Sequence, residues 1–308
     1  MNIVFMGTPD FAVPCLQALL DAGHTVSGVV TQPDKPKGRK YVLTPPPVKV
    51  LAQKNGRPVY QPVSLKQEDS WEPIKAWNPD LIAVVAYGKI LPKTILDLPR
   101  YGCVNVHASL LPRHRGAAPI QWSILMGDKE TGVTTMQMAE GLDTGDMLLK
   151  CRTPIDPQET SGQRHDRLMT MGAKLLVDTV EHIQKGDITP QKQDDSLSTY
   201  ASMLSKSMCP IDWTKGAQEI HNQIRGLSPW PTATTLLEGK TLKVHSSVVD
   251  GTCKGQPGEI AAVKPLTVAC GDGKGLRILE VQYEGGKRML IDAFLRGHPV
   301  KIGMVLGK

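Results

Sequence analysis

Three polar side chains of complementary chemistry fall in two short segments of this 308-residue chain. Asn105 and His107 lie two residues apart in the first segment, and Asp143 lies in the second, between Gly141 and Gly145. An amide can hold a developing oxyanion, a histidine can move a proton near neutral pH, and a carboxylate can orient that histidine and favour its charged form. Acyl transfer requires such a set. The alternative is a strand end with a capping asparagine and a surface histidine.

The first half of the chain predicts an open, mostly parallel α/β sheet that would position these residues. Short apolar runs alternate with helical stretches, and the run at 80–87 is apolar throughout, as in a strand covered on both faces. We predict strands at residues 2–6, 26–31, 80–87, 103–107 and 133–139, and helices at 11–22 and about 160–185. Ligands collect at the carboxyl ends of strands in such sheets. The three polar residues would therefore converge there with Gly7, which follows the first strand.

Several classes of function are disfavoured by what the chain lacks. The turn after the first strand, residues 7–10, is not G-x-G-x-x-G, which argues against a dinucleotide-dependent dehydrogenase. None of the six cysteines shows metal-ligand spacing, so we expect buried or free thiols and no metal site. The longest apolar runs are too short to cross a bilayer, and residues 1–7 resemble neither a signal nor a transit peptide. We expect a cytoplasmic protein with no membrane partner.

The last third of the chain differs from the rest in charge and in pattern. Residues 206–308 hold 14 Lys and Arg against 9 Asp and Glu, a net charge of +5, whereas residues 1–205 have a net charge of +1. After a polar stretch at 190–205, a helix is predicted at 215–225, followed by short strands at 233–237, 241–249, 266–269 and 276–282. Short strands separated by glycines favour a small OB-like barrel. The excess charge suggests nucleic acid as a partner, although an ordinary lysine-rich surface is the alternative.

Residues 34–49 form a second basic segment, with five basic residues and four prolines. Its proline content is too high for the interior of a helix or a sheet. A rigid, basic projection beside the ligand edge could grip phosphates through Lys35, Lys37, Arg39 and Lys40. A solvated surface loop is the competing interpretation.

The amino-acid sequence of these segments is specific enough to identify a family. The chain resembles the methionyl-tRNA formyltransferases, within the wider group of enzymes that transfer formyl from 10-formyltetrahydrofolate. The resemblance runs from residue 2 to about residue 300, and its most specific parts are the stretch at 109–119 and the segment around Asp143. The matching segments are residues 6–11, 32–36, 105–112, 115–121, 141–148 and 225–231.

The resemblance implies transfer of a formyl group to the α-amino group of methionine on initiator methionyl-tRNA. It implies a Rossmann-like catalytic domain at residues 1–189, a linker at 190–205 and an OB-like tRNA-binding domain at 206–308. Family catalytic residues carry over to Asn105, His107 and Asp143, with no metal and no covalent intermediate required. Nothing in the sequence requires an oligomer, and we expect a monomer.

The resemblance also implies a folate site, at Ser109, Leu110, Leu111 and Pro112. The hydroxyl, backbone groups and apolar walls of this stretch suit a flat pterin ring, while core packing is the alternative for the two leucines. The chain departs from the family in two places. The basic segment continues as residues 39–42 without a second glycine, and His114 stands where an aromatic residue is commoner. Neither departure touches the Asn–His–Asp set.

Three rival functions remain at this point. A formyltransferase acting on a sugar nucleotide or a purine precursor would share the chemistry, but it has no need of a basic second domain. A folate hydrolase would use the same three residues with water as acceptor, usually in a longer chain. An RNA-binding protein with an inert catalytic segment has no need of all three residues.

Overall fold

The computed structural model describes residues 1–38 and 41–307, which group into two compact units. Unit 1 comprises residues 1–119, 131–153 and 165–201, and unit 2 comprises residues 120–130, 154–164 and 202–308. The units interleave along the chain, because the segments 120–130 and 154–164 belong to the unit that also holds residues 202–308. The domain boundaries at 189 and 205 stay a prediction.

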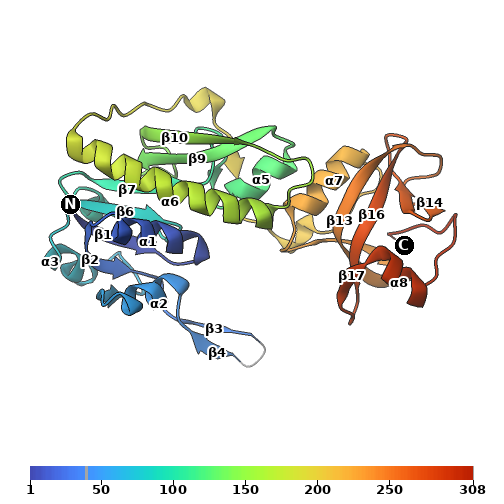
Figure 1. Ribbon diagram of the computed structural model, residues 1–308, viewed down its shortest axis with the longest axis horizontal. Coiled ribbons are helices and arrows are strands. Elements are labelled where there is room, and N and C mark those ends of the chain that lie inside the picture. The colour runs from blue at the N-terminus through green and yellow to red at the C-terminus, as the bar shows by residue number, and fades with distance from the viewer. Residues whose placement is uncertain (39–40, 308) are drawn as a thin grey trace. The chain divides into compact units, whose positions relative to one another are not determined.

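Unit 1 is built on a seven-stranded sheet with strand order β10-β9-β7-β6-β1-β2-β5 (Figure 1). The strands are β1 Asn2–Gly7, β2 Thr25–Val30, β5 Val59–Tyr60, β6 Leu81–Val85, β7 Cys103–His107, β9 Glu130–Gln137 and β10 Met147–Pro154. Strands β5, β2, β1, β6 and β7 pair in parallel, whereas β9 runs antiparallel to β7. The mostly parallel α/β sheet predicted from the sequence is confirmed.

Apolar strands and amphipathic helices together make the core of this unit. All five residues of β6 are buried, as the unbroken apolar run predicts for a strand covered on both faces. The long helix α6, Ser161–Lys185, packs on the sheet, and a Cβ added at its Gly172 would lie 3.1 Å from Val106 of β7. The other helical elements of unit 1 are η1 Asp10–Ala12, α1 Val13–Asp21, α2 Pro47–Lys54, η2 Glu68–Ser70, α3 Glu72–Ala76 and α4 Lys93–Leu96. Helix α5, Pro119–Leu125, belongs to unit 2 from residue 120 onward.

The basic segment forms a projecting hairpin rather than an irregular loop. Strands β3 Lys35–Lys37 and β4 Val42–Thr44 pair antiparallel, and Figure 1 shows this hairpin extending away from the sheet. Helix α2 begins at Pro47, because proline fits the first turn of a helix, where no backbone donor is required. Arg39 and Lys40, two of the predicted phosphate contacts, lie outside the described residues.

The stretch predicted as a linker is ordered against unit 1. Strand β11, Tyr200–Ala201, pairs in parallel with β8, Arg115–Gly116, and a short 3-10 turn, η3, covers Asp195–Leu197. Gln193 is buried although it stands in a polar sequence without a clear period. Residues up to 201 therefore belong to the compact unit that carries β7.

Unit 2 contains a six-stranded antiparallel sheet with order β12-β13-β16-β15-β14, and β17 pairs with β16. Its strands are β12 Ala233–Leu237, β13 Lys240–Thr252, β14 Ile260–Val263, β15 Leu266–Ala269, β16 Lys274–Tyr283 and β17 Arg288–Leu290. Its helical elements are η4 Lys206–Met208, α7 Ala217–Gly226 and α8 Ile291–Gly297. The buried faces of α7, α8 and the sheet form one apolar core. This is the predicted class, a small β-rich domain distinct from the α/β sheet.

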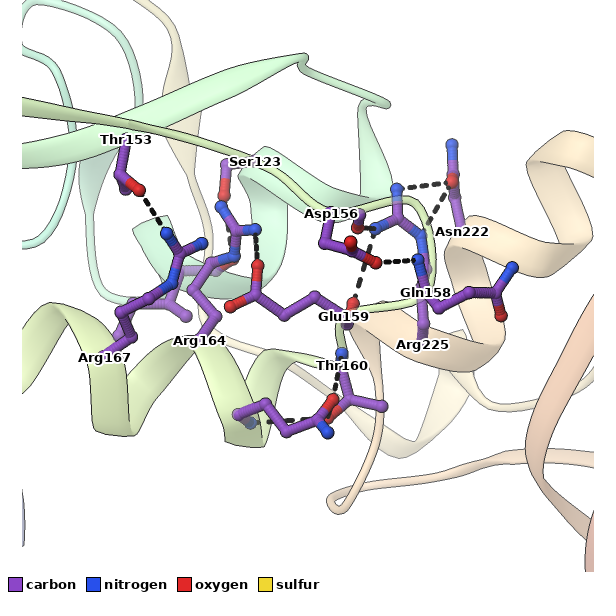
Figure 2. A network of polar contacts seen from close by, with 12 residues as sticks. Ser123, Thr153, Asp156, Gln158, Glu159, Thr160, Arg164, Arg167, Asn222 and Arg225 are labelled. Carbon is purple, nitrogen blue, oxygen red and sulfur yellow. Dashed lines mark hydrogen bonds and ion pairs between the residues drawn. The ribbon is translucent and has the colours of Figure 1, made fainter.

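A buried arginine joins the interleaved segments of unit 2. Figure 2 shows Arg225 of α7 with its guanidinium on Oδ1 of Asn222, at 2.8 and 3.0 Å. The same group donates to the backbone oxygens of Asp156 and Glu159 at 3.2 and 3.4 Å. These carbonyls are satisfied by a fixed cation, so the 154–164 segment is held on α7 by charge-assisted hydrogen bonds.

Candidate active site

Strand β7 carries Asn105 and His107 on one face at the end of the parallel part of the sheet. Residues two apart in a strand point to the same side. Asn105 pairs in register with Val84 of β6 and Met136 of β9, and its side chain is partly exposed. Among the described residues, none is hydrogen bonded to the Asn105 amide, which leaves its NH2 group available to a substrate oxygen.

His107 is fixed by one of its two ring nitrogens. Its side chain is 6% exposed, and Nε2 lies 2.9 Å from the backbone oxygen of His114. A carbonyl oxygen can only accept, so Nε2 carries the proton and donates it to His114. In the neutral ring, Nδ1 is then the free acceptor, and it is the atom that gains a proton when the ring becomes charged.

The carboxylate of Asp143 faces that free nitrogen. Oδ2 lies 3.7 Å from His107 Nδ1, and the Asp143 side chain is 12% exposed. The same oxygen accepts a hydrogen bond of 2.8 Å from the backbone N–H of Gly116. The distance suits an ion pair with a protonated ring but exceeds a direct hydrogen bond. Catalytic contacts are often longer in ligand-free sites than in complexes.

The turn that presents Asp143 has a demanding backbone. Asp143 adopts a φ of 52°, a left-handed conformation that costs a non-glycine residue free energy unless its surroundings hold it. Gly145 follows, and a Cβ added there would lie 1.7 Å from the backbone oxygen of Gln137. Only glycine fits that close approach, which explains why the chain turns through Gly141 and Gly145 on either side of the carboxylate.

The predicted folate residues are tied into the structure around His107. Ser109 is fully buried, and its Oγ donates to the backbone oxygen of Arg113 at 2.7 Å. Leu111 is buried beside Met136, and its backbone oxygen accepts from Lys150 at 2.7 Å. Burial lowers the pKa of the Lys150 ammonium, with the nearby Arg152 acting in the same direction. Leu110 and Pro112 are partly exposed, so the folate role of the four-residue stretch stays a prediction.

The base of the basic hairpin is held by a polar cluster. Lys49 donates to both carboxylate oxygens of Asp34 at 2.9 Å and to Gln61 Oε1 at 2.8 Å. Hydrogen bonds from Gln61 and then from Lys49 lower the pKa of the Asp34 carboxyl. Lys35 is exposed on β3, and its Nζ donates to Gln32 Oε1 at 2.8 Å. The hairpin thus begins from a fixed base close to the carboxyl ends of β1 and β2.

A cavity of about 730 Å³ lies beside the turn that carries Asp143. Apolar side chains line part of it, and basic, acidic, amide and aromatic groups line the rest. The lining residues are Lys93, Leu96, Asp97, Pro99, Arg100, Tyr101, Gly102, Gln137, Met138, Ala139 and Glu140. The backbone N–H of Met138 donates to Cys103 of β7 at 2.8 Å, so one wall of the cavity is bonded to the strand that carries Asn105.

Two supports of the site were not found from the sequence. The backbone oxygen of His114 and the backbone N–H of Gly116 hold the catalytic pair, and main-chain groups leave no sequence signal. The positive φ of His114, 57°, is equally invisible in a sequence. In the part of the chain that the structure describes, no three His, Cys, Asp or Glu side chains gather as a metal-binding group, and no helix is both long and apolar enough to span a membrane.

Comparison with known proteins identifies the family. A formyl transferase domain model matches residues 1–180, and a formyl transferase C-terminal domain model matches residues 203–299. The methionyl-tRNA formyltransferase of Citrifermentans bemidjiense is 52% identical over 310 residues, which covers 100% of this chain and 97% of that protein. That of Clostridium novyi is 51% identical over 310 residues, covering 99% of this chain and 100% of that protein.

Solved structures of lower identity share the fold. An N-formyltransferase from Helicobacter canadensis, solved with folinic acid and dTDP-3-aminofucose, is 18% identical with a TM-score of 0.65, over 90% of this chain and 98% of that chain. HypX from Aquifex aeolicus in complex with tetrahydrofolic acid is 16% identical with a TM-score of 0.65, over 96% of this chain and 47% of that chain. With the domain matches and the full-length relatives, the chain belongs to the formyl transferase family, among the methionyl-tRNA formyltransferases.

Proposed function

We propose that the protein transfers the formyl group of 10-formyltetrahydrofolate to the α-amino group of methionine on initiator methionyl-tRNA. This proposal rests on the pairing of His107 with Asp143. Asn105 lies on the same face of strand β7 as His107. Those three groups suit formyl transfer to an amine. The acceptor follows from relatives at about half identity over the whole chain, which bear the name of that activity.

Asn105 supplies the donor for the developing negative charge. When an amine attacks a formyl carbon, charge builds on the formyl oxygen, and an NH2 group with no other partner can turn to it. Donors preorganised in a partly water-excluded site stabilise such charge strongly, and losing one typically costs about 2.7 to 4 kcal/mol of barrier. The Asn105 side chain needs no rearrangement of existing hydrogen bonds to do this.

His107 and Asp143 handle the protons. Because Nε2 is committed to the His114 oxygen, Nδ1 is the atom that exchanges a proton at the reacting centre. The Asp143 carboxylate beside Nδ1 stabilises the charged ring and also accepts from Gly116, so it stays aimed at the imidazole. A protonated Nδ1 adds a second donor to that of Asn105 and passes its proton to the departing nitrogen, while the Asp143 carboxylate, directly or through water, takes the proton that the attacking amine loses. Return of that proton from Asp143 to Nδ1 restores the pair.

The folate co-substrate supplies the activated formyl carbon. The cavity beside the Asp143 turn offers apolar surface from Leu96 and Met138 to a flat ring, and Arg100 adds positive charge beside the Lys93–Asp97 ion pair and Glu140. The stretch from Ser109 to Pro112 is the sequence-based candidate for the same role. We propose that the cavity takes part of the co-substrate, and that the 109–112 stretch, which does not line the cavity, contributes beside His107.

The acceptor is a polyanion in this proposal. The hairpin of β3 and β4 carries Lys35 and Lys37, and the sequence between its two strands adds Arg39 and Lys40, so this segment of unit 1 is basic. Residues 206–308 carry a net charge of +5. Two basic regions suit two contacts with a tRNA. We assign the domains as predicted, with catalysis in 1–189, a connection at 190–205 and tRNA binding in 206–308. We propose that the protein acts in the cytoplasm as a monomer.

The direct experiment mixes the purified protein, 10-formyltetrahydrofolate and methionyl-tRNA, and follows formylmethionine. His107→Ala is expected to lose most turnover while tRNA binding, measured by filter retention, is kept. His182→Ala changes a half-exposed imidazole on α6 and serves as the matched control. Formylation of a sugar nucleotide or of free methionine as fast as of the tRNA would contradict the acceptor. Wild-type turnover by His107→Ala would contradict the site.

A further inference from the structure

We propose that residues 193–201, which the sequence presents as a linker, position the His107–Asp143 pair for catalysis. Gln193 bonds the backbone of Asp143 directly, and Thr199 acts on His107 through a neighbouring peptide group. The inference rests on the formyl transfer proposed above, since it concerns the residues assigned to that reaction. Neither Gln193 nor Thr199 contacts the reacting atoms, so both are positioning residues.

Gln193 uses its whole amide on the Asp143 turn and on β8. Gln193 is buried, with only 7% of its surface exposed. Nε2 donates to the backbone oxygens of Asp143 and Gly145 at 2.8 and 2.7 Å, and Oε1 accepts from Nε and Nη2 of Arg115 at 3.0 and 2.9 Å. The carbonyls need donors and the guanidinium needs an acceptor, so the partners fix which way the amide lies.

These bonds close a ring around the catalytic carboxylate. Gln193 holds the Asp143 carbonyl, Arg115 holds Gln193, and the next residue after Arg115 is Gly116, whose N–H holds Asp143 Oδ2. Both the backbone and the carboxylate of Asp143 are thereby fixed to one short strand. The left-handed φ of Asp143 needs such support, because a strained residue keeps its conformation only when its surroundings determine it.

Thr199 acts on the other member of the pair. Its Oγ1 accepts from the backbone N–H of His114 at 2.8 Å, and its backbone oxygen accepts from the N–H of Arg115 at 2.9 Å. His114 is the residue whose carbonyl receives the His107 Nε2 proton. The peptide that orients the imidazole is thus itself held by residue 199, and the pairing of β11 with β8 continues the support to Ala201.

Only a glutamine at 193 satisfies all four partners. A glutamate at this position would keep the contact with Arg115, but it has no N–H to donate to the two carbonyls of the turn. An asparagine side chain is one methylene shorter and would not reach all of these partners. A shift of about 1 Å between reacting groups can cost about a hundredfold in rate. Loss of the two donors should therefore lower kcat, whereas binding of tRNA and folate, which does not use Gln193, should be preserved.

The test compares Gln193→Ala and Gln193→Glu with Gln191→Ala, a control at an exposed side chain two residues before Gln193. Both variants at 193 are expected to lower kcat about tenfold or more, with the KM for each substrate within about twofold of wild type and Gln191→Ala unchanged. A wild-type kcat in either variant, or a rise in KM alone, would overturn the role of the two donors.

If Gln193→Ala fails to fold, two variants of Thr199 provide a second test. Thr199→Ser keeps the acceptor for the His114 N–H and is expected to retain kcat, whereas Thr199→Val keeps the shape, removes the acceptor and is expected to lose kcat. Equal rates in this pair would contradict the proposal. A purely structural role would lower the melting temperature of both variants without separating their rates.

A spectroscopic readout separates this inference from the proposed function. The ring signals of His107 in a ¹H–¹⁵N spectrum can be assigned by their loss in His107→Ala. They are expected to shift in Gln193→Glu and Thr199→Val and to stay in place in Gln191→Ala. Unmoved signals would end the inference even if the protein formylates methionyl-tRNA, and moved signals would support it even if the acceptor proved to be another amine.

Discussion

The Nδ1 atom of His107 lies 3.7 Å from Oδ2 of Asp143, although the two residues belong to separate segments of the chain. Strand β7 provides the first and a glycine-bounded turn provides the second. The same Asp143 oxygen receives the Gly116 N–H, and the other ring nitrogen of His107 is held by His114. A histidine and a carboxylate fixed from both sides can move a proton without reorganising their surroundings.

Gly116→Ala is expected to disturb this arrangement through the backbone. Gly116 has a φ of 115°, and a Cβ there would lie 2.7 Å from the Ala201 oxygen and 2.8 Å from the ring of Tyr200. Gly56→Ala is the control, since that glycine also has a positive φ but nothing within 4 Å of the added carbon. Urea unfolding should show a loss of about 1 to 2 kcal/mol in the control and a larger loss in Gly116→Ala.

The activity of Gly116→Ala should fall with that clash. Displacing the Gly116 N–H moves the donor that aims Asp143, so kcat is expected to drop at a temperature where both variants remain folded. An unchanged kcat in Gly116→Ala, together with the expected loss of stability, would show that the bond from Gly116 has no part in aiming the carboxylate.

Neutralising the basic hairpin is expected to weaken use of the tRNA in a salt-dependent way. Replacing Lys35, Lys37, Arg39 and Lys40 by glutamine should raise the KM for tRNA and leave the KM for the folate unchanged. For each lost phosphate contact, the slope of log affinity against log salt should shrink by about 0.7 to 0.9. Lys54→Gln, at an exposed lysine of α2, is the control and should keep the wild-type slope.

Unit 2 should lose stability as the pH falls because of His221. Its Nε2 lies 2.9 Å from the Pro157 oxygen and its Nδ1 lies 3.0 Å from Ser247 Oγ, and burial is the main cause that lowers the pKa of the ring. A histidine with a lowered pKa in the folded state is fully stabilising above its unfolded pKa of 6.5, and the unfolded chain takes up its proton first on acidification.

The stability contributed by His221 is therefore lost as the pH falls below 6.5, with a slope of at most about 1.4 kcal/mol per pH unit for one proton. Urea unfolding of wild type and of His221→Gln at pH 7.5 and pH 5.5 measures it. The wild type should lose more free energy of unfolding between the two values than the variant does. Equal losses in both proteins would assign the acid sensitivity to other groups.

Much of the fold could be predicted because the spacing of apolar residues indicates strands and helices, and glycine and proline indicate where they end. The strand predicted at 103–107 is β7, and the long helix predicted to end before Gly186 ends at Lys185. His107 and Asp143 do meet, but the rule for the carboxyl ends of parallel strands does not explain it, because Asp143 follows β9, which runs antiparallel to β7. The resemblance to a known family added the roles of these residues, which periodicity alone does not provide.

Other parts could not be predicted because their signals are not local. The hairpin at Lys35 resembles a loop in sequence, since prolines and charges mask its short strands. Gln193 stands in a polar run, and its burial depends on Arg115 and on the backbone of Asp143, which are distant in the sequence. The 154–164 segment of unit 2 is held by Arg225, whose partners at Asp156 and Glu159 are backbone oxygens.

The most direct measurement of the central claim is the single-turnover rate of formyl transfer to methionyl-tRNA by wild type and Asn105→Ala. Asn55→Ala, at an exposed asparagine, is the control. We predict that Asn105→Ala slows the chemical step about 10² to 10³-fold while both substrates still bind, because the amide acts on charge that develops in the transition state. A single-turnover rate of Asn105→Ala within twofold of wild type would contradict the account.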